Sequence, residues 1–224
     1  MPVSAPEPRV GRWMATLGFR LRAFRSILDL VPPETSGSRL VDLGAGPGLF
    51  ARAAAKRGFR VTAVDARPPW NIDGSTLSAD RLAGIEFVQS DVRRFNLSGF
   101  DVVSIVGLIY HLTLPEQIDL LSRCDGRMVI VDTELFDEAM TSASARSRIS
   151  QSSNAMGYEG VDWLETDNVW SSKGNRHSFW HTYPSLLRMF KNTGMQSVKV
   201  FEPCYLSEHG LRQWYLLNAP GALK

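Results

Sequence analysis

A glycine-rich segment near residue 40 constrains the fold more than any other feature of the chain. It reads Val41-Asp42-Leu43-Gly44-Ala45-Gly46-Pro47-Gly48, and the alanine-rich residues 49–57 that follow predict a helix ending at Gly58. Glycines after a strand let the backbone approach a ligand closely, and the helix that follows offers free N–H groups at its N-terminus. The segment therefore predicts a strand–loop–helix unit with a ligand at the loop.

Short apolar runs alternate with helical patterns along most of the chain. Strands are expected at residues 39–43, 59–64, 85–89, 100–106 and 127–131, and further helices at residues 115–123 and 184–192. Strands joined by helical crossovers indicate a parallel sheet with helices on both faces. Two last strands, at residues 197–201 and 211–217, have a short connection and must be antiparallel. The prediction is an α/β, Rossmann-like, doubly wound fold: a seven-stranded sheet, mostly parallel, with an antiparallel last strand.

The chain of 224 residues has ordinary globular composition and suits one α/β domain. We expect a flexible tail at residues 1–12 and a single domain at residues 13–224. A helix at residues 13–33, ended by its two prolines, is expected to cover the sheet. Residues 137–178 break the alternation of strands and helices, and their Ser, Asn, Gly and aromatic content predicts an insertion on the substrate side.

Charge and cysteine content limit the location and the partners. Lys and Arg number 25 against 23 Asp and Glu, so the formal charge of +2 makes a nucleic-acid partner unfavoured. No apolar run reaches the roughly 20 residues of a membrane helix, and the N-terminus lacks the apolar segment of a signal peptide. Cys124 and Cys204 have no CxxC spacing and are expected to be buried free thiols. We expect a cytoplasmic monomer or homodimer without a membrane partner.

Three acidic residues distinguish between the cofactors that such a glycine loop can hold. The glycine spacing also satisfies the GxGxxA pattern of nicotinamide enzymes, so glycines alone leave a dinucleotide open. Asp42 can reach a ligand ammonium group, Asp65 at the end of the second strand can accept two ribose hydroxyls, and Asp91 after the third can accept an adenine amino group. An ammonium group, a ribose and an adenine without phosphate describe S-adenosylmethionine.

Residues 40–51, 61–66 and 87–92 resemble, in order, the first three motifs of the class I S-adenosylmethionine-dependent methyltransferases. The likeness extends more loosely to the C-terminus. The ends of the first four strands should then bind the methyl donor. The expected cofactor-binding residues are Asp42, Gly44, Ala45, Gly46, Asp65, Ala66, Asp91, Val92 and Gly107.

The end of the fourth strand should face the transferred methyl group. Its G-L-x-Y-H segment, residues 107–111, resembles that of a subgroup of small-molecule and sugar methyltransferases. A similar segment occurs in bacterial enzymes that alkylate wobble uridine in transfer RNA. His111 is the first candidate for the base that deprotonates an acceptor hydroxyl, with packing or helix capping as its alternative. His181, after the insertion, is the second candidate, as base or substrate contact. Tyr110 and Glu134 complete the expected catalytic group.

The fifth strand carries Asp132 and Glu134, which could orient the substrate or the base. A Mg²⁺ ion held by this pair is possible but not favoured, because the sequence offers no obvious third acid nearby. The G-N-x-x-S-F-W segment at residues 174–180 resembles the substrate-side segment of the same subgroup. The expected substrate residues are Tyr158, Trp163, Asn175 and Trp180.

The sequence thus predicts a methyltransferase that moves a methyl group from S-adenosylmethionine to a hydroxyl of a small polar acceptor. A saccharide or polysaccharide precursor is the favoured acceptor. The alternatives are a methyltransferase of transfer RNA or another nucleic acid, a non-catalytic cofactor-binding protein, and a nicotinamide oxidoreductase, which Asp42 and Asp91 disfavour.

Overall fold

The computed structural model describes residues 12–31, 38–69, 84–166, 168 and 170–218. The tail expected at residues 1–12 lies outside the described residues except for Arg12, and so do both prolines expected to end the first helix.

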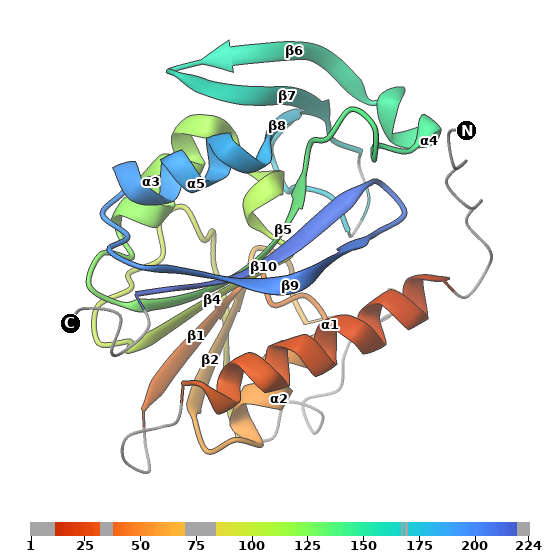
Figure 1. Ribbon diagram of the computed structural model, residues 1–224. Coiled ribbons are helices and arrows are strands. Elements are labelled where there is room, and N and C mark those ends of the chain that lie inside the picture. Colours follow the sequence, from red (N-terminus) through yellow and green to blue (C-terminus); the bar gives the residue numbers. More distant parts are fainter. Residues whose placement is uncertain (1–11, 32–37, 70–83, 167, 169, 219–224) are drawn as a thin grey trace.

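A seven-stranded sheet forms the centre of the protein, with the strand order β3-β2-β1-β4-β5-β10-β9. Only β10 runs antiparallel, to β5 on one side and to β9 on the other. This architecture confirms the predicted Rossmann-like fold (Figure 1). The strands are β1 (Arg39–Leu43), β2 (Arg60–Asp65), β3 (Ile85–Gln89), β4 (Val102–Val106), β5 (Met128–Leu135), β9 (Val198–Leu206) and β10 (Leu211–Leu217).

Helices cover both faces of this sheet because successive strand residues point to opposite sides. Leu40 packs into a cluster with helices α1 (Arg12–Asp29) and α2 (Leu49–Ala55). Its neighbour Val41 packs into a second cluster with α3 (Leu114–Ser122) and α5 (Tyr183–Asn192) on the opposite face (Figure 1).

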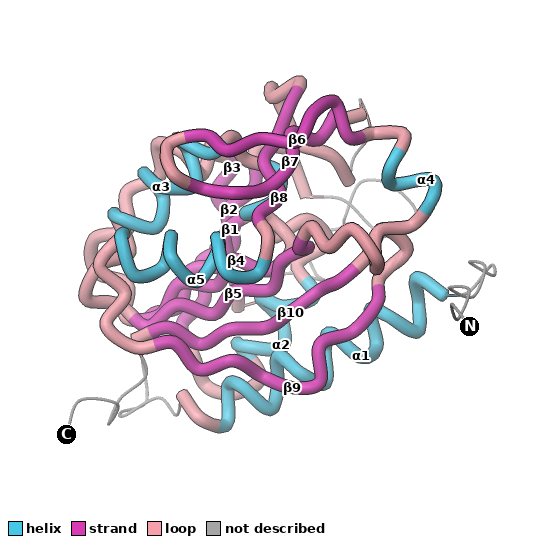
Figure 2. The backbone as a smooth tube through the Cα atoms, turned by 45° about the horizontal axis from the view of Figure 1, so that its top comes forward, coloured by secondary structure: helices cyan, strands magenta, loops and turns pink. Residues whose placement is uncertain are grey.

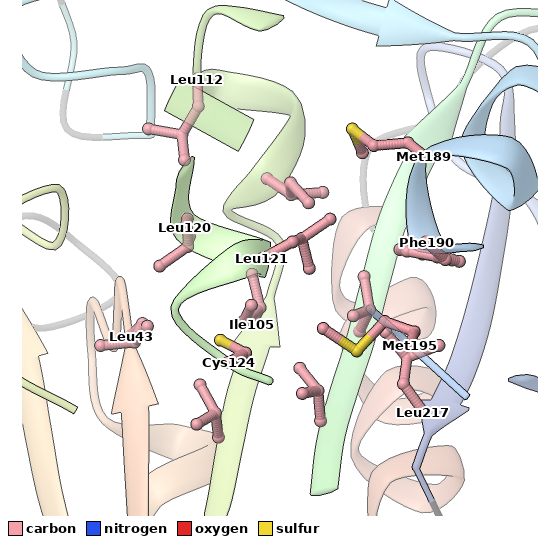
Figure 3. Packing of buried hydrophobic residues seen from close by; sticks show 14 of the residues in the cluster. Leu43, Ile105, Leu112, Leu120, Leu121, Cys124, Met189, Phe190, Met195 and Leu217 are labelled. Atoms are coloured by element: carbon pink, nitrogen blue, oxygen red, sulfur yellow. The ribbon is translucent and has the colours of Figure 1, made fainter. Parts of the chain in front are cut away.

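The second cluster is a dense apolar core between the sheet and helices α3 and α5 (Figure 3). Cys124 lies within it and is fully buried, and burial raises the pKa of its thiol to about 12. The thiol therefore stays protonated and acts as a small apolar side chain. Both cysteines are free, as predicted, but Cys204 is exposed, so the prediction that it is buried is wrong.

The region expected as an insertion folds into a short helix and a second sheet. Helix α4 (Ala143–Arg146) precedes the antiparallel strands β6 (Ile149–Ala155), β7 (Tyr158–Leu164) and β8 (His177–His181). These strands were not predicted, because β6 is mostly polar and lacks the apolar alternation of a half-buried strand. Figures 1 and 2 show the small sheet beyond α3 and α5, separate from the central sheet.

In the described part of the chain, no helix combines the length and the apolar character needed to span a membrane.

Gly160 in β7 gives a test of how the small sheet packs. A Cβ atom at this position would collide with the backbone oxygen of Trp180 and lie 2.7 Å from the Phe179 ring. We expect Gly160→Ala to lower the free energy of unfolding by about 3 kcal/mol, the upper part of the range for overpacking, in urea denaturation. Gly18→Ala is the control, since a Cβ there has Arg22 Nη1 at 3.8 Å as its nearest neighbour. Equal stability of the two variants would contradict this packing.

Candidate functional site

A cavity of about 680 Å³ lies at the carboxyl ends of the parallel strands. Most of the residues singled out in the sequence line it. On the side of the glycine loop these are Gly44, Ala45, Gly46, Asp65, Ala66, Asp91, Val92 and Gly107. On the side of the insertion they are Tyr110, His111, Glu134, Trp163, Asn175 and Trp180. Four others, Asp42, Asp132, Tyr158 and His181, do not line it.

The conformation of the glycine loop depends on the φ angles of its glycines and on hydrogen bonds to Asp65. Gly44 and Gly46 have φ angles of 68° and 50°, in the left-handed region that glycine adopts at little cost. The carboxylate of Asp65 accepts hydrogen bonds from the Gly46 amide at 2.9 Å and from the Arg67 amide at 2.8 Å. Asp65 therefore fixes the loop at the end of β2 while its carboxylate also borders the cavity.

Asp42 is buried in β1, two residues before the loop. Its Oδ1 accepts a hydrogen bond of 2.7 Å from the Ser104 hydroxyl, and its Oδ2 has no hydrogen-bond partner among the described residues. Burial raises the pKa of this carboxyl group to about 7. A buried oxygen without a donor is costly, and an ammonium group or a bridging water would satisfy it. The loop, Asp65 and this oxygen together suit the ammonium and ribose groups of S-adenosylmethionine.

Gly107, after β4, has a φ angle of 75°. A Cβ atom there would lie 2.6 Å from Nη2 of Arg20 and 3.2 Å from Nη2 of Arg212. The sequence predicts that Gly107 lets the backbone lie close to a ligand. In the structure the absent side chain also makes room for two arginines that line the same cavity.

Asp132 is fully buried and ion-paired below the cavity. Arg212 contacts it through Nε at 3.0 Å and Nη2 at 2.8 Å, Arg20 through Nη2 at 2.7 Å, and the Tyr205 hydroxyl donates to it at 2.8 Å. Burial raises the pKa of Asp132, but Arg20 and Arg212 outweigh it and hold the pKa below its usual range. A carboxylate with this many donors is not available to a metal ion.

Glu134 borders the cavity and shares Arg212 with Asp132. Its Oε1 accepts from Arg212 Nη1 at 2.6 Å and its Oε2 from the Ser207 hydroxyl at 2.9 Å. Arg212 thus lies between the two acids proposed for Mg²⁺, and its charge opposes a cation there. Among the described residues, no group of three or more His, Cys, Asp or Glu side chains could hold a metal ion.

Tyr110 packs against the same arginine. Its hydroxyl oxygen accepts a hydrogen bond of 3.1 Å from Arg212 Nη1, and the guanidinium lies over its ring at 5.0 Å. Burial is the largest cause that raises the pKa of this hydroxyl. Tyr110 therefore keeps its proton and can contact an acceptor without serving as its base.

His111 lines the cavity and has an orienting partner. It lies in the short 3-10 helix η2 (Ile109–His111), and its Nδ1 is 3.0 Å from Oε1 of Glu165. Glu165 is buried and also accepts hydrogen bonds from the Ser178 hydroxyl at 2.6 Å and the Ser172 amide at 3.1 Å. Because Nδ1 is bonded to the carboxylate, Nε2 is the nitrogen left for a ligand. Glu165 was missed in the sequence, where a single acid in a polar loop gives no signal.

His181 and Tyr158 do not reach the cavity, which corrects the roles expected for them. His181 is 3% exposed, its Nδ1 lies 2.9 Å from the Ser185 hydroxyl, and its Nε2 lies 3.1 Å from Oε1 of Gln117. Burial lowers its pKa to about 3. The Tyr158 hydroxyl accepts a hydrogen bond from Asn192 of α5 at 3.0 Å. Both residues pack the small sheet against the helices.

Two tryptophans form an aromatic wall on the insertion side. The rings of Trp163 and Trp180 stack with centroids 4.0 Å apart and planes inclined by 13°. Arg148 lies over Trp163 at 4.4 Å, and Tyr110 meets Trp180 edge to face at 5.5 Å. Trp170, which is 46% exposed, lines the cavity from the same side.

Known proteins share this fold and part of this sequence. Residues 40–128 match the model of a family described as "Methyltransferase domain". Ribosomal RNA large subunit methyltransferase E of Wolbachia sp. subsp. Brugia malayi (strain TRS) is 29% identical over 75 residues, which are 30% of each chain. Ubiquinone biosynthesis O-methyltransferase of Hahella chejuensis (strain KCTC 2396) is 28% identical over 120 residues, 49% of this chain and 47% of that one. The chain thus spans less than half the length of these curated relatives.

Solved structures give a likeness over most of the chain. The N-terminal domain of EvdMO1 with SAH (S-adenosylhomocysteine) bound has a TM-score of 0.67 at 17% identity, covering 89% of this chain and 80% of that one. A putative O-methyltransferase from Nostoc punctiforme PCC 73102 has a TM-score of 0.56 at 14% identity, covering 91% and 58%. At these identities the likeness concerns the fold.

The burial of His181 predicts a pH dependence of stability. The native state holds this ring neutral, while the unfolded chain takes up a proton as the pH falls through about 6.5. Stability is therefore present above pH 6.5 and is lost as the pH falls toward 3. We expect this residue to cost the wild type about 2 kcal/mol between pH 7 and pH 5, and His181→Gln to lack that part of the slope in urea denaturation. Parallel pH profiles would contradict the buried neutral histidine.

Proposed function

Because residues 40–128 match the methyltransferase domain and the chain has the class I methyltransferase fold, we propose that it is an S-adenosylmethionine-dependent O-methyltransferase. Its acceptor in this proposal is a hydroxyl of a small polar molecule. The observation that carries the proposal is the pair of His111 and Glu165, 3.0 Å apart, with His111 lining the same cavity as the glycine loop.

The glycine-loop side of the cavity is the proposed cofactor site. The loop from Gly44 to Gly46 would let the cofactor approach the backbone, and Asp65 would accept the ribose hydroxyls. The free oxygen of Asp42 is buried and does not line the cavity, so it would reach the ammonium group through water. Val92 borders the adenine end. S-adenosylmethionine, when bound, supplies an electrophilic methyl group on a sulfonium sulfur.

His111 is the proposed general base. Its Nε2 would take the proton of the acceptor hydroxyl as the methyl group passes from the sulfonium sulfur to the hydroxyl oxygen, which leaves S-adenosylhomocysteine. Glu165 would fix the ring by accepting a hydrogen bond from Nδ1–H and would stabilise the imidazolium that results. Tyr110 and Glu134, both held by Arg212, would contact and orient the acceptor.

A saccharide or polysaccharide precursor is the proposed acceptor class. Trp170, which is 46% exposed, offers an apolar face in this cavity beside the buried stacked pair of Trp163 and Trp180. Asn175 and Glu134 offer hydrogen-bonding groups, and the combination suits a sugar ring. The EvdMO1 domain was also solved in the presence of SAH and D-fucose, with a TM-score of 0.66 to this chain. Another neighbour is a 1,6-didemethyltoxoflavin N1-methyltransferase, so the acceptor proposal depends on the lining residues and not on the fold. Cytoplasmic location and a monomer or homodimer stay predictions.

Transfer of a labelled methyl group to a panel of monosaccharides, nucleotide sugars and RNA tests this proposal. We expect label in a sugar, and a loss of kcat of about 10²–10⁴-fold in His111→Gln, the range supplied by a general base. Glu165→Gln should lose at least about tenfold, because the ring is no longer held. His177→Gln is the control, since that side chain is exposed and does not line the cavity.

Full activity of His111→Gln would contradict the assigned base. Label in RNA and in none of the sugars would contradict the assigned acceptor class.

A further inference from the structure

The carboxylate of Asp91 is bonded on both oxygens by a single neighbour. Oδ1 accepts from the Arg93 amide at 3.0 Å, the single Nε–H is shared between Oδ1 at 2.8 Å and Oδ2 at 2.9 Å, and Nη2 lies 2.6 Å from Oδ2. A carboxylate has about four acceptor positions in all. The hydrogen bonds from Arg93, followed by other effects of its charge, lower the pKa of Asp91, so the pair stays ionised at neutral pH. Three N–H groups of Arg93 thus occupy most of this acceptor capacity.

The other end of the same guanidinium contacts two further segments. Arg93 Nη1 donates to Oε1 of Glu116 at 2.9 Å and to Oδ1 of Asn175 at 3.1 Å. Glu116 lies in the first turn of α3, where it also accepts from the Thr113 amide at 2.9 Å and caps the helix. Asn175 belongs to the connection between β7 and β8, in the insertion.

Asn175 extends the contact to the segment that carries the proposed base. Its Nδ2 donates to Oε2 of Glu116 at 2.8 Å and to the backbone oxygen of His111 at 3.3 Å. An unbroken chain of hydrogen bonds thus runs from the loop after β3, through Arg93 and Asn175, to His111. Asp91, Arg93, His111 and Asn175 all line the cavity.

Charge makes Arg93 hard to replace in this arrangement. It is a single cation between two carboxylates, those of Asp91 and Glu116, and its own side chain is 30% exposed. Burial raises the pKa of Glu116, but Arg93 and the other hydrogen bonds outweigh it and keep the pKa below its usual range. A flat guanidinium can contact three groups at fixed angles, which a lysine ammonium at the same place cannot do.

We propose that Arg93 is a positioning residue that ties the cofactor side of the cavity to the segment carrying His111, and that Asp91 acts through Arg93 instead of accepting from the adenine. This proposal rests on the proposed function, since it assigns roles toward the same cofactor and the same base. It replaces the adenine contact that the sequence analysis expected for Asp91.

Hydrogen exchange on the free protein tests whether Arg93 holds the segments of His111 and Asn175 in place, and it needs no cofactor or acceptor. In Arg93→Gln we expect amide protection across residues 108–113 and 170–176 to fall by about tenfold or more, because the hydrogen bonds that hold both segments are lost. Asn175→Ala keeps the pair of Arg93 with Asp91 and should lower protection in the same two segments. Arg94→Gln is the matched control, since Arg94 is exposed and adjacent. Protection equal to the wild type in both Arg93→Gln and Asn175→Ala would overturn the tie.

Binding of two ligands by calorimetry tests the role of Asp91. The probes are S-adenosylhomocysteine and its analogue without the 6-amino group, each titrated into wild type and Asp91→Ala. If Asp91 acts through Arg93, the affinity ratio of the two probes is the same in both proteins. A ratio of tenfold or more in the wild type that disappears in Asp91→Ala would show a direct contact with the amino group and overturn this part.

Kinetics separates positioning from general stability. At saturating substrates, kcat of Arg93→Gln and of Asn175→Ala should each fall by about tenfold or more, and the double variant should fall no further than the lower single one. Arg93→Lys, which keeps the charge, should recover stability but not kcat. Additive losses, or full kcat in Arg93→Lys, would overturn the positioning role.

Failure of S-adenosylhomocysteine to bind at all would refute the proposed function, while the exchange experiment would still test the contacts of Arg93 with the segments of His111 and Asn175.

Discussion

The buried ion pair between Asp132 and Arg212 is the interaction on which the rest of the site depends. It joins β5 to β10, the strand that runs against the direction of its neighbours, at the end of the sheet where the cavity opens. Arg20 brings α1 to the same carboxylate, and Tyr205 brings β9. Loss of Arg212 would leave Asp132 with Arg20 as its cation and would break the ion pair of Glu134, and breaking such a buried pair costs about 3–5 kcal/mol. Asp132 therefore holds helix α1 and strands β9 and β10 together next to the cavity.

The cavity beside this ion pair has two sides with different chemistry. On one side the backbone of the glycine loop and Asp65 offer a rigid site for the proposed methyl donor. On the other side the tryptophan wall and His111 come from the insertion and from the segment after β4. A reaction between two bound molecules depends on their alignment. Contacts that join the two sides, such as those of Arg93, then matter as much as the groups that touch the ligands.

The sequence was informative where structure depends on neighbouring residues and silent where it depends on distant ones. Apolar runs and glycines predicted the strands and the fold, which the structure confirms. Glu165 contacts His111 across 54 residues of sequence, and Arg93 contacts Asn175 across 82, so no local pattern could reveal them. His111 and His181 both follow apolar segments; only burial and hydrogen bonding separate them. The strands of the insertion escaped prediction because β6 is mostly polar and β8 is buried on both faces, so neither shows the alternation of a half-buried strand.

The central claim is that this cavity binds S-adenosylmethionine, although its glycine spacing also satisfies a dinucleotide pattern. Calorimetric titration of the wild type with S-adenosylhomocysteine, beside NAD and NADP, tests it most directly. We expect saturable binding of S-adenosylhomocysteine at one site, loss of that binding in Asp65→Ala, and no heat with either dinucleotide. Binding of NAD or NADP without binding of S-adenosylhomocysteine would contradict it.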